Sequence, residues 1–155
     1  MTNSSDFHPG DDPYNLNRFL QAQQGDYERA LSEIKAGRKR THWIWYVFPQ
    51  LEGLAFSSTS QHYSIKSLDE ARAFLAHPVL GPRLIECAEA VMSVENRSAH
   101  EIFGSPDDLK VRSCATLFAL VSPSGSVFER LLKQLFPAGR DAKTLELLRV
   151  GSSSS

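Results

Sequence analysis

Apolar residues recur along most of the chain at the spacing of one helix face, three or four residues apart. In the clearest stripe, Cys114, Leu117, Phe118 and Val121 occupy positions i, i+3, i+4 and i+7. Such stripes predict amphipathic helices that each bury one face in a common core. Further stripes lie at residues 16–20, 27–34, 80–91, 127–136 and 145–148.

Polar residues and glycines mark where these helices should begin and end. Ser67 with Glu70, and Ser98 with Glu101, have the spacing of a capping box, in which the hydroxyl and the carboxylate each accept a backbone N–H. Ser105 precedes Pro106, and we expect this serine to cap a helix that has proline at its first position. Further expected caps are Asp26 and Asp141, and expected stops are Gly25 and Gly37.

Signals for β-strands are weak. Only Trp43–Phe48 is rich in aromatic and β-branched residues, and it shows neither alternation nor a neighbouring hairpin turn. We therefore predict an all-α fold, a compact and irregular single domain of about seven to eight short helices. The predicted domain is 13–150, between a flexible N-terminal arm (1–12) and a Gly/Ser tail (151–155) that is disordered or a remnant of cloning.

Charge and cysteine content narrow the class of protein. The net charge of the 155-residue chain is −1, which gives no field to attract nucleic acid or an anionic membrane. The first residues lack the charged and apolar regions of a signal peptide, and no apolar run approaches the roughly 20 residues of a membrane span. Cys87 and Cys114 lie inside apolar runs, so we expect buried, reduced thiols in a cytoplasmic protein.

Motifs for metal binding and catalysis are missing from the sequence. It contains no C-x-x-C, no H-x-x-x-H, no G-x-S-x-G and no glycine-rich phosphate loop, so we expect no metal and no cofactor and assign no catalytic residue. Cys114 lies on an apolar stripe, where a thiolate nucleophile is disfavoured. The uncharged loop Ser122–Ser126 could cradle a phosphate, or could simply join two helices.

The segment Arg38–Gln50 is the densest in chemical groups, because it joins a basic triplet to four aromatic residues, a histidine and an amide. One interpretation is a surface on which an aromatic ring stacks under a base while Arg and Lys hold phosphate. The alternative is a core element, with Trp43, Trp45, Tyr46 and Phe48 fully packed, beside a solvated run of charged residues. A second candidate is the turn-rich stretch with His77 and Arg83, which could clamp an anion, or whose histidine could instead bond the backbone at a helix start.

The run Gly37–Gln50 resembles the signature of a bacterial family known as domain of unknown function 1810. The resemblance extends from about Asn15 to Leu148 and implies a compact, mainly α-helical domain with no established activity, substrate or catalytic residue. Further matching motifs are Ser67–Leu84, Ile102–Lys110 and Thr116–Phe118.

A shorter likeness concerns N-glycosidases that act on ADP-ribose and riboflavin precursors. Gln61-His62-Tyr63 is similar to their Glu-His-Tyr, although a glutamine cannot serve as acid or base. This likeness implies hydrolysis of an N-glycosidic bond as an alternative function, with Glu70 or Asp108 as the candidate base.

The leading hypothesis is a pocket for a small anionic ligand such as a nucleotide or an ADP-ribose-like compound. One alternative is a non-enzymatic module that binds a protein partner through an apolar patch. Another is nucleic-acid binding through Arg38–Arg40, which would be weak and strongly salt-dependent. The predicted ligand-binding residues are His42, Trp45, Gln50, Tyr63, His77, Arg83 and Lys110.

Overall fold

The computed structural model describes residues 12–153, and the side chains of residues 12–149. These residues form ten helices, seven of them with seven residues or more, and no strand. The all-α prediction is therefore confirmed. The helices are α1 (Asn17–Gln23), α2 (Tyr27–Lys35), α3 (Ile44–Val47), α4 (Ser58–His62), α5 (Leu68–Ala76), α6 (Leu80–Ser93), α7 (Ala99–Phe103), α8 (Asp107–Leu120), α9 (Val127–Leu135) and α10 (Ala142–Ser153).

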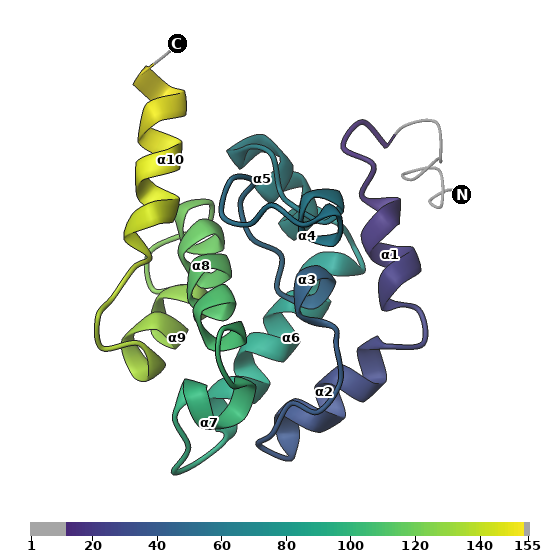
Figure 1. Cartoon of the computed structure of the whole chain (residues 1–155), viewed down its shortest axis with the longest axis vertical. Coiled ribbons are helices and arrows are strands. Elements are labelled where there is room, and N and C mark those ends of the chain that lie inside the picture. The colour runs from purple at the N-terminus through teal and green to yellow at the C-terminus, as the bar shows by residue number, and fades with distance from the viewer. Residues whose placement is uncertain (1–11, 154–155) are drawn as a thin grey trace.

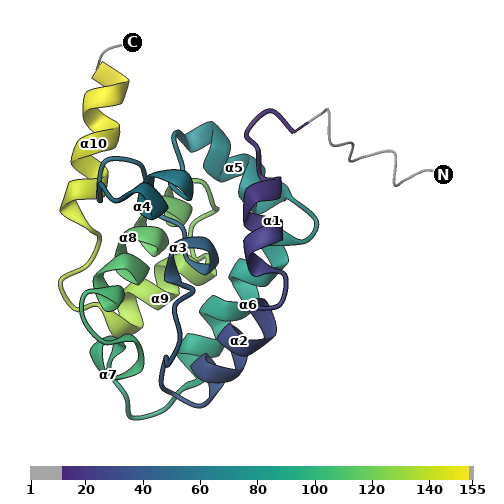
Figure 2. The same ribbon diagram turned by 45° about the vertical axis from the view of Figure 1, so that its right-hand side comes forward.

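The two longest helices, α6 and α8, organise the others. Helix α6 packs on α2, α5 and α9, whereas α8 packs on α3, α5, α7, α9 and α10 (Figure 1). Helices α1 and α2 lie on the opposite side of the molecule from α10, and α10 projects beyond the remaining helices in both views (Figure 2). The first part of α10 therefore docks on α8, while its end stands away from the body of the fold.

A row of aromatic rings runs through the core from α1 to α9. Phe19 meets Phe74 edge-on with 5.0 Å between ring centroids, Phe74 lies 5.4 Å from Phe118, and Phe118 lies 5.7 Å from Phe128. All four side chains are buried. Tilted and edge-on ring pairs add to the gain from burying the rings, so this row links four helices that are distant in sequence.

The family-like segment Arg38–Gln50 is anchored by a buried carboxylate. Glu33 on α2 accepts hydrogen bonds from the backbone N–H groups of Arg40 (2.8 Å) and Thr41 (3.0 Å), from the Thr41 hydroxyl (2.7 Å) and from the Trp43 indole (2.9 Å). Trp43 is 1% exposed, and residues 44–47 form helix α3 rather than a strand. The core interpretation is therefore confirmed for Trp43 and for the buried Phe48, whereas Trp45 and Tyr46 are only partly buried.

The same contacts set the ionisation of Glu33. Burial by itself raises the pKa of this carboxyl, but the hydrogen bonds from Arg40, Trp43 and Thr41 outweigh burial and lower the pKa from 4.5 to about 2. A carboxyl with a depressed pKa stabilises the fold above its unfolded pKa. That stabilisation is lost as the pH falls through the folded pKa.

Some of the expected caps are present and others are replaced. The Ser98–Glu101 capping box is confirmed, and Asp141 accepts the Thr144 N–H (3.0 Å) at the start of α10. Ser67 caps α5 as predicted, but the Glu70 carboxylate accepts the N–H of Lys66 instead of that of Ser67. The predictions for two other caps were wrong: Asp26 makes no side-chain cap bond because it accepts the Tyr46 hydroxyl, and Pro106 rather than Ser105 occupies the cap position of α8.

Both cysteines are free and buried, as expected. Burial raises the pKa of Cys87 to about 12 and the pKa of Cys114 well above its usual value. Neither thiol therefore has the thiolate character that a nucleophile needs.

We predict that Glu33→Ala lowers the free energy of unfolding by about 3 kcal/mol at pH 7, because it leaves the buried Trp43 indole N–H and three partly buried donors of Arg40 and Thr41 without their acceptor. Glu33→Gln should also flatten the dependence of stability on pH between about 4.5 and 2, where this carboxyl releases its contribution. Urea unfolding at a series of pH values measures both effects. Glu28→Gln, at an exposed position of the same helix, is the matched control. A pH profile of Glu33→Gln that overlays the wild type would contradict the prediction.

Candidate functional site

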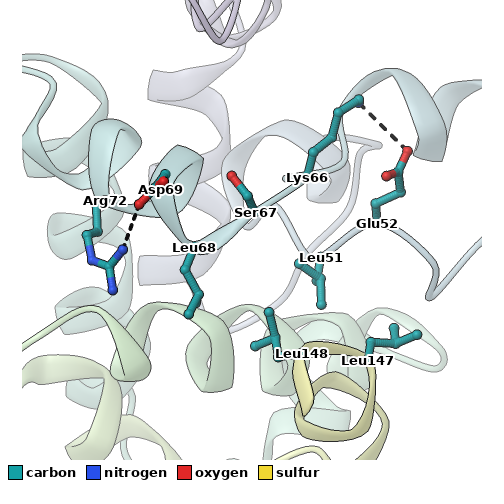
Figure 3. A pocket seen from close by; sticks show the side chains of 9 residues that line it. All are labelled: Leu51, Glu52, Lys66, Ser67, Leu68, Asp69, Arg72, Leu147 and Leu148. Atoms are coloured by element: carbon teal, nitrogen blue, oxygen red, sulfur yellow. Dashed lines mark hydrogen bonds and ion pairs between the residues drawn. The ribbon is translucent and has the colours of Figure 1, made fainter. Parts of the chain in front are cut away.

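One cavity lies between α5, α10 and the residues next to the isolated parallel bridge that joins Leu51 to Ile65. Its volume is about 510 Å³, within the range of about 300–1,000 Å³ that is typical of small-molecule sites. We call it the leucine cavity. It is lined by Leu51, Glu52, Lys66, Ser67, Leu68, Asp69, Arg72, Leu147 and Leu148 (Figure 3).

Four leucines form the apolar part of this cavity. Leu51 and Leu68 point to the side on which α10 lies, and Leu148 points from α10 back toward this side of the segment (Figure 3). Leu68, Leu147 and Leu148 are half-buried, so part of their apolar surface remains in contact with water. Covering that surface with an apolar part of a ligand would be favourable by about 25 cal/mol for each Å² removed from water.

Two cations flank the leucines. Lys66 forms a long ion pair with Glu52 (3.9 Å), and Arg72 pairs with Asp69 one turn earlier on α5 (2.8 Å). The side chains of all four residues are more than half exposed. Exposed ion pairs contribute about 0–1 kcal/mol, so breaking either pair costs little. Glu52 and Asp69 line the same cavity, so an anionic ligand gains from Lys66 or Arg72 only where it displaces the carboxylate from that cation.

A second cavity, of about 430 Å³, shares Lys66 and Ser67 with the first. We call it the polar cavity, because side chains that form hydrogen bonds dominate its wall. The remaining lining residues are Pro13, Tyr14, Asn15, Arg18, Gln61, His62 and Glu70.

The Arg18–Glu70 ion pair (2.7 Å) forms the base of the polar cavity and is almost completely buried, with 8% and 3% of the two side chains exposed. The guanidinium also donates to the backbone carbonyls of Tyr14 (2.6 Å), Asn15 (2.9 Å), His62 (2.7 Å) and Ser64 (2.8 Å). The second oxygen of the carboxylate accepts the Lys66 N–H (2.9 Å). This arrangement favours a structural role for Glu70 over that of a general base, because both of its oxygens already accept strong donors.

Trp45 and Lys110 are the two predicted ligand-binding residues that the structure brings together. The Lys110 ammonium lies 4.0 Å from the centroid of a Trp45 ring and pairs with Asp107 (3.0 Å), which also pairs with Lys39 (2.9 Å). Burial raises the pKa of Asp107, but the two ammonium groups outweigh burial and lower it. Lys39 and Lys110 thus share a carboxylate that already neutralises much of their charge.

Arg83 is engaged within the fold. It lies over the Tyr27 ring with 4.7 Å to the centroid, and it donates to the side chain of Gln23 (3.2 Å). It also lines a smaller cavity of about 350 Å³ beside α1. Cation–π contact and a hydrogen bond hold the guanidinium against α1 and α2.

His77 has the role that its position before Pro78 favoured. Its backbone is extended after α5, and its Nδ1 accepts the N–H groups of Val79 (3.1 Å) and Leu80 (3.2 Å) at the start of α6. Burial lowers the pKa of this imidazole, which suits a neutral ring acting as an acceptor.

The other three predicted ligand-binding residues line neither cavity. Gln50 is buried, and its backbone carbonyl accepts the Ile65 N–H (2.9 Å). Tyr63 is half-buried, with its ring 5.2 Å from that of Tyr46, and His42 is exposed. Within the described residues, none of the seven predicted residues lines the leucine cavity or the polar cavity.

The remaining candidates for anion binding or catalysis also have partners. At the Ser122–Ser126 loop, the Glu129 carboxylate accepts the N–H of Gly125 (2.7 Å), so an acid occupies the place that a phosphate would take. Asp108 accepts the N–H of Leu109 (2.9 Å) and lies 3.6 Å from His100. Over residues 12–149, no three His, Cys, Asp or Glu side chains are arranged to hold a metal ion.

Sequence reasoning missed the two cations of the leucine cavity, Lys66 and Arg72. Lys66 directly precedes the recognised cap Ser67, and Arg72 follows the acidic Asp69 by one turn. The nearest signal in the sequence was therefore the start of α5 itself, which we treated only as a helix boundary.

This geometry defines the protein as an all-α domain with two adjoining surface cavities. The chain belongs to the family described as "Protein of unknown function (DUF1810)", whose model matches residues 13–148. It is also similar to the solved structure of the conserved hypothetical protein Rv1873 from Mycobacterium tuberculosis, with 48% sequence identity and a TM-score of 0.87. The match covers 89% of this chain and 99% of the mycobacterial one.

The comparison with curated proteins found no match. No helix in the described part of the chain is long and apolar enough to cross a membrane. The resemblance to this family is thus confirmed, and the family's description assigns no function.

We predict that Arg18→Met lowers the free energy of unfolding by about 3–5 kcal/mol, because it leaves the Glu70 carboxylate buried without its partner. The double variant Arg18→Met/Glu70→Met should recover a large part of that loss. Chemical denaturation measures both, and Arg18→Lys replaces Arg18→Met if the latter does not fold. Arg29→Met, which breaks an exposed pair with Asp26, is the control and should cost at most about 1 kcal/mol. Equal losses for Arg18→Met and Arg29→Met would contradict the prediction.

Proposed function

We propose that this protein binds a small anionic ligand with an apolar or aromatic part, of the nucleotide class, in the leucine cavity. The observation that carries this proposal is the combination of half-buried leucines with two weakly paired cations in one cavity of about 510 Å³. Small-molecule sites typically have such an apolar lining with a few polar groups that fix orientation.

Two other cations, Arg18 and Lys39, form ion pairs whose side chains are mostly buried, and this supports the choice of Lys66 and Arg72. Arg18 has all its donors engaged, and Lys39 is 7% exposed and paired with Asp107. Replacing these partners by a ligand would cost several buried hydrogen bonds. Lys66 and Arg72, by contrast, can exchange an exposed carboxylate for a phosphate with little loss.

The alternatives have less support in the geometry. Phe56, Leu109 and Val79 are the exposed large apolar side chains among the described residues, and no cavity is lined by two of them. Apolar side chains exposed singly are ordinary and do not make a docking patch. The pairing of Lys39 with Asp107 reduces the charge available for nucleic acid. The engaged carboxylate of Glu70 disfavours its use as the base of an N-glycosidase. We also propose the cytoplasm as the compartment, because two buried free cysteines are typical of a reducing environment.

A screen of AMP, ADP and inorganic phosphate by thermal shift and calorimetry tests the proposal. A nucleotide at about 100 times its dissociation constant should add about 2.7 kcal/mol of stability. Arg72→Gln should weaken nucleotide binding about tenfold, which corresponds to about 1.4 kcal/mol for one charged hydrogen bond.

The matched control is Arg29→Gln, because Arg29 is also an exposed arginine paired with an aspartate three residues away. The control should bind like the wild type. Failure of both AMP and ADP to bind, or an equal effect of the two substitutions, would contradict the proposal.

A further inference from the structure

The leucine cavity and the polar cavity meet at the short segment before α5. Lys66 and Ser67 line both cavities, so the two cavities adjoin at these residues. The side chains of this segment face opposite ways: Leu68 points to the side of the segment on which α10 lies, whereas Lys66 and Ser67 point to the other side (Figure 3). One side of the junction is therefore apolar and the other polar.

The lining of the polar cavity suits a group rich in hydroxyls. Asn15 offers amide donors and an acceptor, and His62 offers an imidazole. The Gln61 amide nitrogen donates to the Phe56 carbonyl (3.2 Å), which leaves its side-chain oxygen and a second N–H for a ligand. Gln61 and His62 are exposed, so a ligand can reach them without rearrangement of the core. The polar cavity has no cluster of leucines comparable to that of the first cavity.

The junction itself is suited to an anionic link. The Lys66 ammonium is 56% exposed and lies 3.9 Å from its carboxylate partner. The Ser67 hydroxyl accepts the Glu70 N–H (3.0 Å), and a hydroxyl that accepts can still donate its own proton. The buried Glu70 does not repel an anion here, because the Arg18 guanidinium neutralises it at 2.7 Å.

We infer that the ligand has two parts joined by an anionic link: a base or other flat apolar group in the leucine cavity, and a sugar in the polar cavity. The link, of the phosphate or diphosphate class, lies beside Lys66 and Ser67. This inference rests on the proposed function and adds the second half of the ligand. It assigns recognition of the sugar to Gln61 and His62, which the proposed function does not use.

Calorimetry with ADP and with ADP-ribose tests the inference, because the two probes share base and diphosphate and differ in the second sugar. ADP-ribose should bind the wild type at least tenfold more tightly than ADP. The double variant Gln61→Ala/His62→Ala should lose this advantage while binding ADP unchanged. Arg18 bonds only the backbone carbonyl of His62, so these substitutions leave that bond in place. Lys66→Gln should weaken binding of both probes.

The matched control is His100→Ala, an exposed histidine on α7 outside both cavities. Its affinity for both probes should equal that of the wild type. Equal affinities of the wild type for ADP and ADP-ribose, with no effect of the Gln61/His62 substitutions, would overturn the two-part ligand. In that case, binding of ADP that still depends on Arg72 would leave the proposed function standing. Failure of both probes to bind would overturn both.

Discussion

The fold around the site depends on one buried guanidinium. Arg18 ties α1 to the end of α4, to the segment that precedes α5 and to the Glu70 carboxylate inside α5. Helices of five to nine residues are too short to be stable by themselves, so most of their stability must come from tertiary contacts. A planar fork of five donors can serve several carbonyls at once, which a single lysine ammonium cannot do. The junction of the two cavities is built on this centre.

Glu33 is the counterpart of Arg18 on the other side of the core. Its carboxylate accepts hydrogen bonds from the residues just before α3, and one of these bonds holds the indole of Trp43 in the core. In both cases a buried charge is tolerated because it is fully hydrogen-bonded. Most of the chemical groups in the segment Arg38–Gln50 therefore stabilise the fold. Its aromatic residues and its lysine are used mainly to connect α2, α3, α7 and α8.

The candidate site is identified by the difference between charged side chains with buried partners and those with exposed partners. Charged groups with complete, buried partnerships hold the short helices together and are expensive to disturb. Lys66 and Arg72 belong to the other group, because their partners are exposed and can be exchanged. They also flank the half-buried leucines of the leucine cavity, to which α10 contributes Leu147 and Leu148. A ligand that covers the leucines and engages the cations would complete contacts that the protein alone leaves unfinished.

The sequence alone was sufficient for the all-α class, for most helix positions, and for local features such as the Ser98–Glu101 box and the Asp141 cap. These depend on periodicity and on contacts three or four residues apart, which a linear pattern records. Only the tertiary structure decided which charged side chains have buried partners and which have exposed ones. Glu70 is paired with a residue 52 positions away, and Arg83 with one 60 positions away. The seven predicted binding residues were chosen by chemical type, and several of them stabilise the fold. The cavity instead arises where α5 and α10 approach, and no local pattern encodes that approach, because it depends on how all the helices pack.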